Sequence, residues 1–161
     1  MNNSEIAQTA SPHTSRLDRM TLEQFESVFV DEEACRRFVL SRRWPGGVAC
    51  PRCNNTQLLA LKARPWHWQC RNCSPSGYRF SLLVGTPFKG THYPLRTWFR
   101  IAHFLLISEP YVTAQQIADV MGNTMSHQAA WYLYHRVREG LQDPIIRRLL
   151  GLTASAVDRL R

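Results

Sequence analysis

The stretch CPRCNNTQLLALKARPWHWQCRNC, residues 50–73, begins and ends with a pair of cysteines. Two residues separate the thiols within each pair, so both sulfurs of a tight turn can face one ion. The sixteen residues between the pairs are enough for a hairpin that brings the second turn opposite the first. Four thiolates favour Zn²⁺ over iron and leave no position for water. The sequence therefore predicts one structural zinc ion bound by Cys50, Cys53, Cys70 and Cys73.

The segment around these cysteines, residues 48–83, consists of short apolar and polar alternations between turns. Such runs are typical of short β-strands, and we expect strands over 57–62, 66–69 and 78–83. A unit of this size has little apolar core of its own, so the bound metal is expected to hold it folded.

Helical signals precede this unit. Thr21-Leu22-Glu23-Gln24 has the form of a capping box, and Asp31 is a suitable N-cap for a second helix that ends near Trp44. The odd cysteine, Cys35, falls among the apolar positions of that helix and is expected in the core rather than at the metal. Residues 1–20 are polar and lack the apolar stretch of a secretory signal, so we expect a disordered arm.

Three further helices are expected over 94–107, 113–121 and 126–141. Ala118 precedes Gly122 by four positions, which allows close helix packing followed by a left-handed turn. This pattern predicts a helix-turn-helix, a motif whose last helix enters the DNA major groove. The alternative is a three-helix bundle that only packs or dimerises.

The buried face of the last helix is left open by the sequence. A stripe of Ala130, Leu133 and Val137 fits the helical period, but Trp131, Tyr134 and Val137 fit it nearly as well.

Together these patterns predict an α+β fold, with short N-terminal helices, a small β zinc ribbon and a mainly α-helical helix-turn-helix module. The expected divisions are a disordered arm (1–20), the N-terminal helices with the zinc ribbon (21–90), the helix-turn-helix domain (91–142), and a C-terminal helix and tail (143–161).

The charge distribution points to a polyanionic partner. The formal net charge is +8, and residues 34–108 contain twelve Arg or Lys without a single Asp or Glu. A long basic stretch of this kind is typical of nucleic-acid binding, and the arginine fork suits phosphates and guanine edges. An Arg-rich solvated surface is the alternative. No apolar run reaches the roughly 18 residues of a membrane span.

We therefore expect double-stranded DNA as the partner, no membrane association, and a cytoplasmic, nucleoid-associated location; whether the chain forms a homodimer stays open. Base contacts should come from the start of the last helix and backbone contacts from the turn before it and from the ribbon. The expected base-contacting residues are Ser126, His127 and Gln128, and the expected phosphate-contacting residues are Asn123, Thr124, Arg136, Lys62, Arg64, Arg71 and Arg79.

Several motifs, in order along residues 21–142, resemble the N-terminal region of zinc-ribbon insertion-sequence transposases. They are Phe25, Phe29 and Asp31-Glu32-Glu33-Ala34-Cys35; Arg43-Trp44-Pro45-Gly46-Gly47-Val48-Ala49-Cys50; Gly85-Thr86-Pro87-Phe88; Pro94-Leu95-Arg96-Thr97-Trp98-Phe99; Ala129-Ala130-Trp131; and His135-Arg136-Val137-Arg138-Glu139. The resemblance implies that the ribbon and the helix-turn-helix bind transposon ends. It also implies that Trp131 is a packing residue.

In such transposases a ribonuclease-H-like domain follows, with an Asp, Asp, Glu (or Asn) set that holds two metal ions. Here only Asp143 and Asp158 are acidic beyond Glu139, and Val157-Asp158 resembles the position of the first catalytic Asp. One carboxylate cannot build a two-metal site. We therefore expect a DNA-binding part truncated before the catalytic domain, with no catalytic residues. The alternatives are a stand-alone transcriptional regulator and a transposase completed by a second polypeptide.

Overall fold

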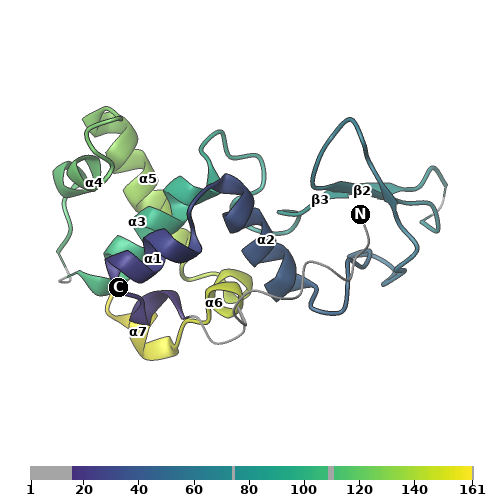
Figure 1. Ribbon diagram of the computed structural model, residues 1–161, viewed down its shortest axis with the longest axis horizontal. Coiled ribbons are helices and arrows are strands. Elements are labelled where there is room, and N and C mark those ends of the chain that lie inside the picture. Colours follow the sequence, from purple (N-terminus) through teal and green to yellow (C-terminus); the bar gives the residue numbers. More distant parts are fainter. Residues whose placement is uncertain (1–15, 74, 109–110, 161) are drawn as a thin grey trace.

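The computed structural model describes residues 16–73, 75–108 and 111–160, which form seven α-helices, one 3-10 helix and a three-stranded antiparallel sheet (Figure 1). This confirms the α+β class. No helix in these ranges has the length and hydropathy that crossing a membrane requires. In chain order the elements are η2 (Leu17–Arg19), α1 (Leu22–Val28), α2 (Glu32–Arg43), β1 (Leu59–Ala60), β2 (His67–Cys70), β3 (Tyr78–Ser81), α3 (Leu95–Ile107), α4 (Ala114–Val120), α5 (His127–Gly140), α6 (Pro144–Leu150) and α7 (Ala154–Asp158).

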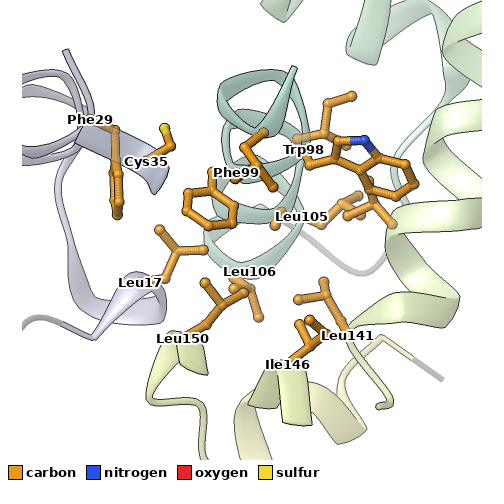
Figure 2. Packing of buried hydrophobic residues seen from close by; sticks show 14 of the residues in the cluster. Leu17, Phe29, Cys35, Trp98, Phe99, Leu105, Leu106, Leu141, Ile146 and Leu150 are labelled. Carbon is orange, nitrogen blue, oxygen red and sulfur yellow. The ribbon is translucent and has the colours of Figure 1, made fainter. Parts of the chain in front are cut away.

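Helix α3 is the central element of the helical body, a name used here for η2 and the seven α-helices. Its buried residues include Trp98, Phe99, Leu105 and Leu106, so it is apolar around most of its circumference. A helix of this kind must be covered on several sides. Helices α2, α4 and α5 and the 3-10 helix η2 all pack on it, and Figure 2 shows side chains from α6 and from the N-terminal segments meeting it.

The expected helix starts are present. Thr21 with Gln24, and Thr113 with Gln116, form complete capping boxes. Asp31, Ser126 and Asp143 accept backbone N–H bonds as N-caps of α2, α5 and α6. Each satisfies amides that a helix leaves without an internal partner.

Helix α3 begins differently, because its N-cap position is Pro94, which offers no side-chain acceptor. The carboxylate of Glu32 in α2 takes this role. Its two oxygens accept from the backbone N–H groups of Leu95 and Arg96, each at 3.0 Å. A negative charge at this end is also favoured by the helix dipole. The Arg96 guanidinium continues the junction by donating to the carbonyl of Phe29 at 2.6 Å.

Both ends of the described chain belong to the helical body. Leu17 and Met20 are buried, and the Met20 carbonyl accepts from Nε2 of the buried His103 at 2.8 Å. Ordered structure therefore begins before the expected boundary at residue 21, while the rest of the expected arm, residues 1–15, lies outside the described residues. Ile146 and Leu150 of α6 are likewise in the main core, so residues 143–160 close the core rather than trail from it.

The sheet has the order β1-β2-β3, with Leu59 opposite Gln69, Trp68 opposite Phe80 and Cys70 opposite Tyr78. Strands β1 and β3 are shorter than the sequence suggested, and β2 has the expected length but begins one residue later. The ribbon, residues 48–84, lies at one end of the long axis of the molecule, and α4 lies at the other (Figure 1). Helices α1 and α2, which the sequence grouped with the ribbon, share the main apolar cluster with α3 instead.

Candidate metal centre and nucleic-acid interface

The four predicted ligand sulfurs converge. All four Sγ atoms lie within 4.8 Å of one another. The separations are 3.7 Å for Cys50 and Cys73, 3.5 Å for Cys53 and Cys70, and 3.6 Å for Cys53 and Cys73. A tetrahedral zinc ion with Zn–S bonds of about 2.3 Å requires sulfurs about 3.8 Å apart. The residues therefore fit one structural zinc ion with a complete set of protein ligands.

Backbone turns position the thiols. The carbonyl of Cys50 accepts from Asn54 N–H at 2.9 Å, and Asn54 takes the left-handed conformation that closes this knuckle. In the second knuckle, Gly77 N–H donates to the Cys73 carbonyl at 2.7 Å. A Cβ at Gly77 would approach the Cys70 carbonyl to 3.0 Å, and its φ is +81°. Only glycine meets both demands without strain.

Asn55 supports the metal centre from outside the ligand set. Its side-chain amide donates to Sγ of Cys70 at 3.7 Å. Burial disfavours the Cys70 thiolate, but hydrogen bonds from Asn55 and from the neighbouring thiols lower the pKa of Cys70 to about 6. Burial and the hydrogen bonds with the same group of thiols raise the pKa of Cys73 to about 12. A deprotonated sulfur is the form that binds zinc. No pattern in the sequence singled out Asn55, because its role depends on a ligand fifteen positions away.

Cys35 is separate from this centre, as expected. It is fully buried in the main core, and burial raises the pKa of its thiol to about 12. A neutral thiol in apolar surroundings behaves as a small packing residue.

Two residues at the end of α2 join the ribbon to the helical body. The Trp44 ring packs on Trp68 and Phe80, with centroid separations of 6.0 and 6.2 Å. The Arg43 guanidinium donates to the Leu82 carbonyl at 2.6 Å and also to that of Val84. Charge-assisted hydrogen bonds to two carbonyls hold the turn that follows β3, where the chain leaves the ribbon. These contacts give the ribbon a defined orientation on α2.

The ribbon residues expected to contact DNA are all exposed. Lys62 and Arg64 lie between β1 and β2, Arg71 lies in the second knuckle, and Arg79 lies on β3. Nε of Arg79 makes one long hydrogen bond, 3.4 Å, to the side chain of Gln69. Because residues 34–108 contain no carboxylate, every charged side chain that the ribbon exposes is positive.

In the α4–turn–α5 segment, two helices that pack on each other are joined by a tight turn. Gly122 and Asn123 are both left-handed, with φ of 68° and 54°, and Asn123 N–H closes the turn on the Ala118 carbonyl at 2.8 Å. The exposed predicted contacts of this region are Asn123, Thr124, Ser126, His127, Gln128 and Arg136.

Two of these side chains form hydrogen bonds with the nearby backbone. The Thr124 hydroxyl donates to the Met121 carbonyl at 2.7 Å. The Ser126 hydroxyl oxygen accepts from Ala129 N–H at 3.1 Å as the cap of α5. His127 and Gln128, in the first turn of α5, are both exposed.

The structure resolves the face of α5. Ala130, Leu133 and Val137 are buried, whereas Trp131 is 55% exposed. The expectation that Trp131 packs in the core is wrong, because α3 and α4 cover the neighbouring face and a step of one residue turns the side chain about 100° away. Trp131 instead contacts the His135 ring, with centroids 4.3 Å apart. It therefore adds an aromatic surface beside Gln128 that the sequence did not identify.

One comparison with known proteins found a match. Residues 30–76, from the start of α2 to the second knuckle, match the family model of the transposase zinc-ribbon domain. Comparisons with curated proteins and with solved structures found no match. The matched segment contains all four metal ligands and the Trp44 contact that orients them. Residues 30–76 of this chain thus match a transposase zinc-ribbon domain, and its four cysteines fit one structural zinc ion.

Proposed function

We propose that the protein binds double-stranded DNA at a specific sequence, as the part of a transposase that recognises transposon ends. Two features of the same chain carry this proposal. The exposed charges of its zinc ribbon are all positive, and the first turn of helix α5, which follows a left-handed turn, is exposed. The match of residues 30–76 to a transposase zinc-ribbon domain supports the choice of DNA as partner.

The two regions have different roles in this proposal. Lys62, Arg64, Arg71 and Arg79 contact the phosphate backbone and supply affinity without sequence preference. Gln128 lies at the start of α5 and can pair with both edge atoms of an adenine in the major groove. Trp131, exposed on the same helix, offers an apolar surface to a thymine methyl group.

Charge predicts how binding depends on salt. If the four ribbon cations each displace a counterion from a phosphate, the logarithm of the affinity falls with the logarithm of salt concentration with a slope of about −3.6. Contacts from Arg136 would make the slope steeper. The ribbon thus provides most of the sequence-independent attraction.

Selection of bound duplexes from a random DNA pool, with zinc-loaded protein and with chelated protein, tests the proposal. We expect a single recovered motif with zinc and loss of enrichment after chelation. A motif that occurs in inverted repeats flanking the gene supports transposon-end recognition, whereas a motif found in promoters indicates a transcriptional regulator. Zinc-loaded, folded protein that enriches no sequence and binds no duplex would refute the proposal.

A further inference from the structure

A basic cleft of about 330 Å³ lies where the end of α2, the first zinc knuckle and α6 meet. Arg42, Arg43 and Arg148 line it, together with an apolar wall that includes Trp44 and Pro51. None of the lining residues is acidic. The volume corresponds to the share of roughly ten water molecules in the liquid, which is ample for a phosphate group and part of a sugar.

Helix ends explain part of this charge but not all of it. Arg42 and Arg43 are in the last turn of α2, and Arg148 is in the last turn of α6, where cations favour the helix dipole. Each helix C-terminus carries the equivalent of about half a negative charge. Two such ends offset roughly one positive charge of the cleft, and Arg42 makes a further contact within the chain. The hydrogen bonds from Arg43 to two carbonyls position the guanidinium but leave its charge in place.

The surroundings of the arginines also favour a bound anion. Burial lowers the pKa of Arg42 and that of Arg43, which shows that the site disfavours their charged forms. Arginine nevertheless stays protonated, so an anion in the cleft would restore the solvation that burial removes. Arg148 is exposed at the rim and keeps its donors accessible.

We propose that this cleft holds one phosphate of the DNA backbone, with Arg148 as its principal donor and Arg42 and Arg43 as the charged wall behind it. This inference rests on the proposed function, DNA binding, and adds a contact to it. The ribbon and α4 lie at opposite ends of the long axis (Figure 1), and the cleft joins the first knuckle to the helical body. A phosphate seated there lies between the first knuckle and helix α6 and fixes the duplex at the junction of the ribbon and the helical body.

The test compares Arg148→Gln with Arg147→Gln, using fluorescence anisotropy on a duplex recovered by the random-pool selection. Arg147 is the adjacent arginine of α6 and does not line the cleft, so both variants remove one charge from the same helix. We expect Arg148→Gln to weaken binding by roughly five- to tenfold at low salt and to lower the salt slope by about one. Arg147→Gln should change affinity by less than about twofold, with the slope unchanged.

A second measurement identifies the phosphate. Uncharged methylphosphonates replace the backbone phosphates one at a time, and binding is measured for wild type and for Arg148→Gln. One position should weaken wild type but have little further effect on the variant, because both changes remove the same contact. Circular dichroism confirms that both variants are folded, and Arg148→Lys, which keeps the charge but loses the fork, should give an intermediate affinity.

Four results would overturn the inference. Equal effects of the two glutamine variants, or additive effects at every methylphosphonate position, mean that no phosphate occupies the cleft while DNA binding itself stands. Thermal stabilisation of wild type but not Arg148→Gln by inorganic phosphate, with unchanged DNA affinity, would identify a free-anion site instead. Wild type that binds no duplex would refute the proposed function together with this inference.

Discussion

The ribbon and the helical body differ in what keeps them folded. The ribbon has a small buried cluster of its own, made of Cys50, Cys70, Phe80 and Val84, and two of these residues are zinc ligands. The main cluster of the helical body extends from Leu17 to Leu160 and needs no metal ligand. Metal coordination thus replaces apolar burial where the chain is too short to enclose a core.

The largest expected effect comes from removing the metal. Cys73→Ser, or chelation, should unfold residues 48–84 while the helices remain, because zinc binding contributes on the order of 10 kcal/mol to such sites. Zinc content and amide hydrogen exchange measure the two regions separately. Cys35→Ala is the control, since it removes a buried thiol from the helical body and should leave one zinc per chain. If the ribbon amides stay protected from exchange without metal, zinc is not what keeps the ribbon folded.

Shortening a buried side chain in the helical body should destabilise the helices and leave the zinc bound. Phe99 is fully buried on α3 and contacts Phe29, Phe38 and Phe88. Phe99→Ala should lower the free energy of unfolding by about 3–5 kcal/mol through lost burial and a cavity. Urea denaturation followed by helical circular dichroism measures this loss, and zinc content should remain one per chain below the transition. Loss of zinc in the folded variant would show that the two regions fold as one unit.

The ribbon and helix α5 of the helical body should also differ in how they bind DNA. Gln128→Ala should lower discrimination between the selected site and random duplex by about 1–3 kcal/mol. Arg64→Ala should weaken binding to both duplexes equally and reduce the salt slope by about one. Competition anisotropy with the two duplexes separates these outcomes. If the two variants change affinity and discrimination in the same proportion, the assignment of base contacts to α5 and phosphate contacts to the ribbon is wrong.

The smallest effect concerns the junction of α2 and α3. Glu32→Gln keeps the shape of the cap but removes the charge that accepts from Leu95 and Arg96, so we expect a loss of about 1–2 kcal/mol. Glu33→Gln is the matched control, because Glu33 forms an exposed pair with Arg37 on the same helix and such pairs contribute less than about 1 kcal/mol. Thermal unfolding of both variants and the wild type measures the difference. Equal melting temperatures for the two variants would mean that Glu32 is not the cap of α3.

Short-range features were predictable from the sequence. The capping residues, the cysteine knuckles and the left-handed turn at Gly122 all close hydrogen bonds or coordination within three to five positions. The residue types at these few positions therefore largely decide whether each feature forms. The buried position of Cys35 followed from its place on one helical stripe. The metal ligands were predictable for the further reason that two cysteine pairs at this spacing are typical of structural zinc sites.

Long-range features needed the tertiary structure. The sequence left two stripes open on α5, and the resemblance favoured the wrong one for Trp131, because the choice depends on how α3 and α4 lie against that helix. Residues 143–160 were expected to form a helix and tail, yet Ile146 and Leu150 complete the core. A short amphipathic helix shows its apolar face in the sequence but not what covers it.

The sequence alone determined the metal, its four ligands, the positive charge of the ribbon and the order of the helices, since these depend on residue type and local spacing. Only the tertiary structure decided that Glu32 caps a helix sixty-three positions away, that Arg43 holds the exit of the ribbon, and that Arg42, Arg43 and Arg148 share one cleft. These contacts join segments whose approach is set by helix packing. No local pattern encodes which side chains such packing brings together.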